Sequence, residues 1–158
     1  MTDKVEFFLL DIKEIHQLES LWNKLRLHHL DNTIHFKNHF QVQEFDGRIK
    51  PLLEKATEGE IRIEVAKDAL TKQWIGYCIS SIVAKPVAQG EIESLYVDKG
   101  YRGMKIGDSF MRNALQWMDE RKVQQKVVAV VAGNESALPF YAKYGFFCRV
   151  LVLHQTQL

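Results

Sequence analysis

The sequence is short of cysteine and of long hydrophobic runs, and each shortage excludes a class of protein. Cys78 and Cys148 form no C-x-x-C pair and both lie in apolar stretches, so we expect reduced thiols in the core and no disulfide framework. No apolar run approaches membrane-spanning length, and the N-terminus carries charges too early for a signal peptide. These features predict a soluble, cytoplasmic protein with no membrane partner.

An excess of one charge is also missing. The 21 lysines and arginines nearly balance the 20 aspartates and glutamates, which gives a formal net charge of +1 at pH 7. Because no basic stripe is concentrated anywhere, we expect no nucleic-acid partner. With 158 residues, 46% apolar and 26% charged, the composition is that of a globular protein. We expect residues 1–158 to form a single domain.

Hydrophobic periodicity predicts alternating strands and helices. Strands are expected at 4–12, 60–68, 73–84, 91–98, 126–132 and 146–154. Helices are expected at 13–29, across 34–55 as two helices or one broken one, at 105–121 and within 135–145. The continuous apolar run at 126–132 predicts a strand buried on both faces. The order indicates antiparallel strands in the middle of the chain, then a helical crossover to a parallel neighbour.

The segment YRGMKIGDSF, residues 101–110, connects an expected strand to an expected helix. It is neither a P-loop nor a dinucleotide fingerprint. Gly103 and Gly107 leave room for a phosphate near the backbone, Arg102 and Lys105 add positive charge, and a helix N-terminus favours an anion. The residues alone equally allow a plain helix start, with Asp108 complementing the helix dipole.

Two blocks, ESLYVDKGYRGMKIGDSFM and VVAVVAGNESALPFYAKYGF, resemble the GNAT family of acetyl-CoA-dependent N-acetyltransferases. The family loop reads Gln/Arg-x-x-Gly-x-Gly/Ala. Residues 102–107 match it at the first and last positions, whereas Lys105 replaces the internal glycine. The resemblance implies an α/β (α+β) GNAT fold: a mixed, mostly antiparallel sheet of about six to seven strands flanked by helices. It also implies a V-shaped splay between the strands at 91–98 and 126–132.

The resemblance implies acetyl-CoA as cosubstrate and no metal. The pyrophosphate is expected on the amides of residues 102–108, the pantetheine arm along the backbone of 95–97, and the amine acceptor on the side of the first helices. A backbone N–H near Tyr96 or Val97 would polarise the thioester carbonyl. The implied cofactor-binding residues are Leu95, Tyr96, Val97, Arg102, Gly103, Met104, Lys105, Ile106, Gly107, Asp108, Asn134, Phe140 and Tyr141.

Three residues are candidates for catalysis. Tyr141 matches the family tyrosine near the CoA sulfur, where a phenol can protonate the departing thiolate; without the resemblance it reads as a core aromatic beside Phe140. Glu91 lies where some family members carry a catalytic glutamate, and Glu93 points to the same strand face. Either glutamate could act as base, directly or through water. Both could instead bind a cationic amine, or be solvated strand residues.

The sequence therefore predicts an N-acetyltransferase that works by direct attack of an amine in a ternary complex. A catalytically inactive acyl-CoA-binding module and a nucleotide-binding regulator are the alternatives. The acceptor stays open between a polyamine, a peptide amine and an antibiotic amine. His35 and His39 have metal-ligand spacing, but two histidines without cysteines are a weak zinc signal. A homodimer is expected through the edge of the last strand.

Overall fold

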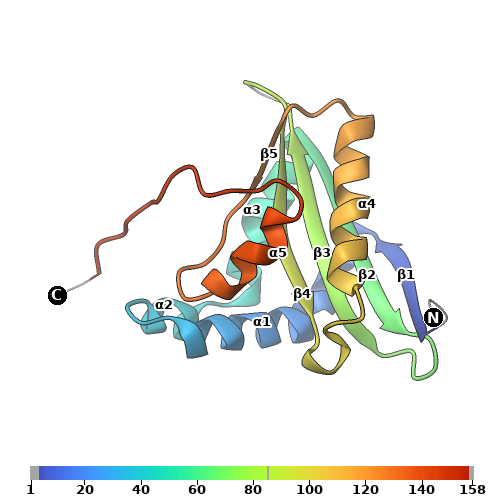
Figure 1. Cartoon of the computed structure of the whole chain (residues 1–158), viewed down its shortest axis with the longest axis horizontal. Helices are drawn as coiled ribbons and strands as arrows, with labels where there is room; N and C mark the ends of the chain where they lie inside the picture. The colour runs from blue at the N-terminus through green and yellow to red at the C-terminus, as the bar shows by residue number, and fades with distance from the viewer. Residues whose placement is uncertain (1–3, 85, 157–158) are drawn as a thin grey trace.

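The computed structural model describes residues 4–84 and 86–156 (Figure 1). Its described residues contain one five-stranded sheet in the order β1-β2-β3-β4-β5. The strands are β1 (Val5–Leu10), β2 (Gly59–Asp68), β3 (Trp74–Val83), β4 (Gln89–Val97) and β5 (Gln125–Val128). The first four are antiparallel neighbours, and β5 is parallel to β4 after a crossover through α4 (Ile106–Glu120). The predicted fold class, a mixed and mostly antiparallel sheet flanked by helices, is confirmed.

Helices cover both faces of this sheet (Figure 1). The 3-10 helix η2 (Ile12–Leu18), α1 (Glu19–Asn32) and α3 (Phe45–Glu58) bury apolar side chains on one face. The second helix, α2 (Lys37–Val42), packs against α1. On the other face, α4 and the short α5 (Leu138–Ala142) share a second apolar cluster. Burial of these amphipathic faces is the main stabilising contribution to such layers.

A β-bulge in β4 shapes the region between β4 and β5. Ile79 pairs with Ser94 and Ser80 with Ile92, so Glu93 has no partner in the ladder with β3. On the opposite edge, β4 pairs with β5 only from Gln89–Gln125 to Ile92–Val128. Bulges bend a strand and increase its twist. The two strands therefore separate after Ile92, which is the predicted V-shaped splay.

The predicted strand at 146–154 is wrong. These residues carry no regular secondary structure, and the sheet ends at β5. Strand-forming side chains form a strand only where a neighbouring edge pairs with them, and here the chain after α5 runs away from the sheet (Figure 1). Cys148 lies in this segment and is exposed, so its assignment to the core is also wrong, whereas Cys78 is buried as expected.

The strand predicted at 126–132 is shorter and more open than expected. It spans Gln125–Val128, and none of its residues is buried. The continuous apolar run suggested burial on both faces, but β5 is an edge strand beside the splay. In the N-terminal part, the first turns of the predicted helix at 13–29 are 3-10, and α1 runs on to Asn32. The segment 34–55 forms two helices, α2 and α3.

Among the described residues, no helix is both long enough and apolar enough to cross a membrane.

Candidate functional site

A cleft of about 260 Å³, partly open to solvent, lies where β4 and β5 separate. The residues after the bulge and the chain that follows β5 form one wall. Helices α1 and α2 and the first turn of α3 form the other, and Tyr141 of α5 reaches in from the far face of the sheet. The lining residues are Trp22, Leu25, Arg26, His29, His39, Phe40, Gln43, Arg48, Ile92, Glu93, Ser94, Leu95, Val128, Ala129, Val130, Val131, Asn134 and Tyr141.

The loop between β4 and α4 presents a run of free backbone amides. Within the described chain, the N–H groups of residues 103–108 donate no hydrogen bond to another protein group, and the first bond of the helix start runs from Ser109 N to Lys105 O. Such orphan donors at a helix N-terminus bind anions. The Arg102 side chain stays on the loop side, where its Nε donates to Val97 O at 3.0 Å.

Lys105 adopts the turn expected of a glycine. Its φ is +61° and its ψ is 19°, a left-handed conformation at the N-cap of α4, and Gly103 has φ +82°. A residue with a Cβ is strained there by about 1–2 kcal/mol relative to glycine. Lys105, which stands where the family pattern has its internal glycine, thus holds a left-handed turn in this chain. The side chain is exposed.

Gly107 and Asp108 connect the loop to α5. A Cβ built on Gly107 would lie 3.2 Å from Cζ of Phe140, so the absence of a side chain lets α5 pack closely on α4. Asp108 accepts a hydrogen bond from Lys143 Nζ at 2.6 Å and one from the Tyr144 hydroxyl. These two hydrogen bonds lower the pKa of Asp108. The Asp108 carboxylate thus holds α5 in place.

Tyr141 is held by aromatic neighbours on α5 and beyond. Its ring meets Phe140 edge to face at 5.2 Å between centroids, and Phe146 at 6.5 Å. Burial, with a smaller contribution from Cys78, raises the pKa of Tyr141 to about 12. The phenol is therefore protonated throughout the neutral range. Because Tyr141 also lines the cleft, it is a half-buried proton donor at the wall of an open site.

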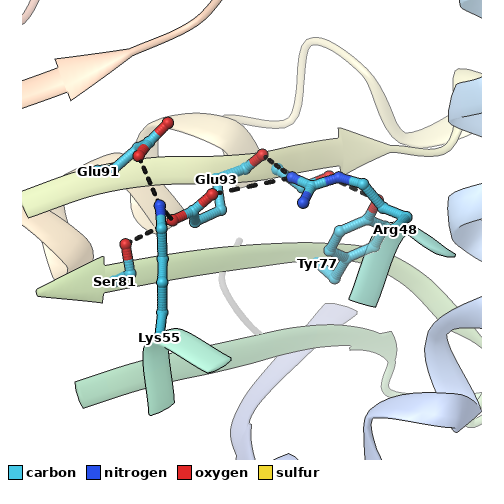
Figure 2. Close-up of polar contacts among 7 residues, drawn as sticks. Arg48, Lys55, Tyr77, Ser81, Glu91 and Glu93 are labelled. Atoms are coloured by element: carbon cyan, nitrogen blue, oxygen red, sulfur yellow. Dashed lines mark hydrogen bonds and ion pairs between the residues drawn. The ribbon is translucent and has the colours of Figure 1, made fainter. Parts of the chain in front are cut away.

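Glu91 and Glu93 point to the same face of β4 and share one cation (Figure 2). Lys55 Nζ, which reaches up from α3, donates to Glu91 Oε2 at 2.8 Å and to Glu93 Oε1. Burial alone would lower the pKa of Lys55, but the hydrogen bonds to both glutamates outweigh it, so the pKa is raised. Glu93 also accepts from Ser81 Oγ at 2.6 Å, and Arg48 Nη2 lies 3.9 Å from its Oε2.

Two arginines and a histidine line the helical wall. Arg48 Nη2 donates to Glu93 O at 2.7 Å, and Arg26 Nη1 donates to Phe40 O at 2.6 Å. His29 is buried enough that desolvation lowers its pKa to about 4, with a further contribution from His28. Its Nδ1 is the buried polar side-chain atom without a partner among the described residues. The histidine is thus neutral at pH 7.

Asn134 ties the chain after β5 to α1. Its Oδ1 lies 3.2 Å from His28 Nε2, which places Asn134 at the cleft wall shared by both segments. His39 also lines the cleft, whereas His35 does not. Over the residues that the structure describes, no three His, Cys, Asp or Glu side chains are grouped to hold a metal ion.

The structure brings four of the predicted site residues together in the cleft: Glu93, Leu95, Asn134 and Tyr141. Glu91 lies beside the cleft on Lys55, Tyr96 is buried under α1 and α3, and residues 102–108 form the loop at the end of β4. Sequence reasoning missed Arg26, Arg48 and Lys55. These residues belong to no motif, and the partners Lys55 and Glu91 are 36 positions apart, so only the fold reveals them.

Comparison with known proteins agrees with this geometry. A model of the acetyltransferase (GNAT) family matches residues 22–146. A relative, the phosphinothricin N-acetyltransferase of Streptomyces coelicolor, is 28% identical over 97 residues. The match covers 60% of this chain and 57% of that protein, so the chain spans little more than half of the relative's length.

Solved structures share the whole fold. A putative acetyl transferase from Pyrococcus furiosus superposes with a TM-score of 0.70 at 22% identity, covering 96% of this chain and 100% of that one. A predicted acetyltransferase from Clostridium acetobutylicum, solved with acetyl-CoA, gives a TM-score of 0.68 at 17% identity and covers 96% of each chain. At these identities the likeness is one of fold.

Proposed function

Because the chain belongs to the acetyltransferase (GNAT) family, we propose that it transfers the acetyl group of acetyl-CoA to an amine acceptor by direct attack in a ternary complex. The observation that carries the proposal is the single cleft that Tyr141, the splayed part of β4 and helix α1 line together. This cleft contains a proton donor (Tyr141), the part of the β4 edge that β5 does not pair with, and a separate helical wall for a second substrate. The relative named as an N-acetyltransferase supports nitrogen as the acceptor atom.

The residues present fit acetyl-CoA. The unbonded amides of 103–108 would hold the pyrophosphate, with Arg102 and Lys105 adding positive charge. The edge of β4 that no longer pairs with β5 would hold the pantetheine arm at Leu95–Val97. Phe140 of α5 and Asn134, in the chain after β5, would complete the acetyl-CoA site. When bound, acetyl-CoA supplies the activated acetyl group as a thioester.

Tyr141 acts as the general acid in this proposal. As the new C–N bond forms and the C–S bond breaks, the phenol donates its proton to the departing sulfur, and water later reprotonates Tyr141. A pKa of about 12 keeps the proton on the phenol until sulfur gains negative charge. A positioned acid of this kind accelerates a reaction by about 10²–10⁴-fold. Backbone N–H groups near Tyr96 or Val97 would stabilise the carbonyl oxygen.

The amine must lose a proton on each turnover. Glu93 lines the cleft and Glu91 does not, which supports Glu93 as the group that accepts this proton, through a water molecule. Glu91 then serves to keep Lys55 in place. The products are an N-acetylated amine and CoA thiol, and the proton released by the amine passes through Glu93 to solvent.

A thiol-release assay with acetyl-CoA and a panel of amines tests the proposal. We expect release that depends on both substrates and falls when Tyr141 is replaced by Phe. Tight binding of acetyl-CoA, measured by calorimetry, without release from any amine would identify a non-catalytic acyl-CoA-binding protein instead.

A further inference from the structure

The charges on the helical wall of the cleft limit which acceptors fit. The ionisable side chains that line the cleft are Arg26, His29, His39 and Arg48 on the helical wall, Glu93 on β4 and Tyr141 on α5. Glu93 is the one carboxylate among the described lining residues. Both arginines are half-buried, where a charge interacts more strongly than on an open surface. The cleft lining as a whole therefore carries more positive than negative charge.

The glutamates are already neutralised from within the protein. Lys55 binds Glu91 at 2.8 Å and also binds Glu93, while Arg48 stands 3.9 Å from Glu93 (Figure 2). Two carboxylates are thus matched by two cations. A cationic acceptor would have to displace Lys55 to reach either carboxylate, and would then leave a half-buried ammonium without its partners.

Arg26 is the cation that remains. Its Nε donates to Asn23 Oδ1 at 2.9 Å and its Nη1 to Phe40 O, and both acceptors are uncharged. Across the described residues, no carboxylate lies within ion-pair distance of Arg26. A guanidinium has five N–H donors in a planar fork that matches a carboxylate, so donors are left over after these two bonds.

We propose that the acceptor carries a carboxylate close to its amine, as an amino acid does, and that Arg26 binds this carboxylate. The inference rests on the proposed acetyl transfer and specifies its acceptor. The guanidinium pairs with the carboxylate while the amine points along the cleft toward Tyr141. His29 is neutral and Arg48 lies beside Glu93. Arg26 is therefore the positive charge that selects a negatively charged acceptor. Polycationic acceptors are disfavoured by the same group.

Matched pairs of acceptors test this assignment. The specificity constant kcat/KM is measured with acetyl-CoA for free amino acids, for the corresponding amino-acid carboxamides and for spermidine. Each carboxamide keeps the amine and the side chain and loses the negative charge of the carboxylate. Its amine is also less basic and less protonated at neutral pH, which biases the comparison against the expected result. We expect the acids to exceed the carboxamides by about tenfold or more, since hydrogen bonds between charged groups are the stronger ones.

Variants separate recognition from folding. Arg26→Gln should abolish the preference for acids over carboxamides while the KM for acetyl-CoA stays within about threefold, and Arg26→Lys should keep part of the preference. Lys50→Gln, an exposed change on α3 outside the cleft, is the control and should leave the ratio unchanged.

If kcat/KM for the carboxamides or for spermidine equals that for the acids, the inference is overturned and acetyl transfer still stands. The same holds if the preference for acids survives in Arg26→Gln. If the protein binds acetyl-CoA but releases CoA thiol with none of the acceptors, the proposed function is overturned and the inference with it.

Discussion

Lys55 of α3 and Glu91 of β4 form an ion pair of 2.8 Å that joins a helix to the strand beneath it. The same ammonium binds Glu93, whose side chain is only 6% exposed. Lys55→Met should lower the free energy of unfolding by about 1–3 kcal/mol, because both partly buried carboxylates lose the ammonium and only Glu93 keeps a cation, Arg48, nearby. Urea denaturation measures the change.

Lys50→Met is the matched control, because Lys50 is exposed on the same helix and should shift the unfolding midpoint little. The double variant Lys55→Met/Glu93→Gln should recover part of the loss, since one unpaired charge is removed. Equal midpoints for Lys55→Met and the wild type would show that the cluster does not stabilise the fold.

Tyr141→Phe removes the proposed acid and little else, because the ring keeps its contacts with Phe140 and Phe146. We expect kcat to fall by about 10²-fold or more and the KM for acetyl-CoA to change by less than about threefold. Steady-state kinetics with the best acceptor measures both constants. Unchanged turnover would remove Tyr141 from the acid role.

Lys105 offers a test that separates backbone strain from charge. Lys105→Gly relieves the positive φ of +61° and should stabilise the fold by up to about 1 kcal/mol, whereas Lys105→Ala keeps the Cβ and should not. Both variants lose the ammonium, so both should weaken CoA binding by a similar factor that shrinks at high salt. Calorimetry at two salt concentrations gives these factors. Wild-type affinity in both variants would show that Lys105 contributes only the turn.

The loop and the cleft differ in how far the sequence reveals them. The glycines at 103 and 107, the aromatic pair at 140 and 141, and the helical periodicity of 105–121 are local signals, and they predicted α4 and the short α5. The charge pattern of the cleft is not local, because Arg26, Arg48 and Lys55 acquire meaning only when α1 and α3 pack on β4. The strand at 146–154 was predicted wrongly for a related reason: apolar, β-branched side chains mark strand propensity, whereas pairing depends on a neighbouring edge.

His29 makes stability depend on pH. Its pKa is about 4 in the folded protein against an ordinary 6.5, so the unfolded chain binds the proton more readily. Stability should therefore be lost as the pH falls from about 6.5 toward 4, by about 2 kcal/mol at pH 5. Unfolding curves of His29→Gln should lack this part of the pH dependence. His35→Gln, at an exposed position, serves as control, and equal pH slopes in the two variants would contradict the assignment.

The segment after α5 exposes large apolar side chains, with Phe147 78%, Leu151 81% and Leu153 91% exposed. Contiguous exposed apolar residues favour association with another chain, and so does an open edge strand such as β5. We expect sedimentation equilibrium to show a homodimer that Leu151→Asp/Leu153→Asp dissociates. Leu70→Asp, in the equally exposed β2–β3 turn, should leave it intact. A wild-type monomer at all concentrations would rule out this expectation.

Acetyl transfer to nitrogen is tested most sharply by following the acetyl group itself. The protein is incubated with acetyl-CoA labelled with ¹³C in the acetyl group and, in separate reactions, with an amino acid, its carboxamide and spermidine, and the products are analysed by mass spectrometry. We expect label in an N-acetylated amine, the amino acid above all, together with an equal amount of free CoA thiol. Label that stays on CoA with every amine, or is released as acetate at a rate that does not depend on the amine, would show that the protein is not an N-acetyltransferase.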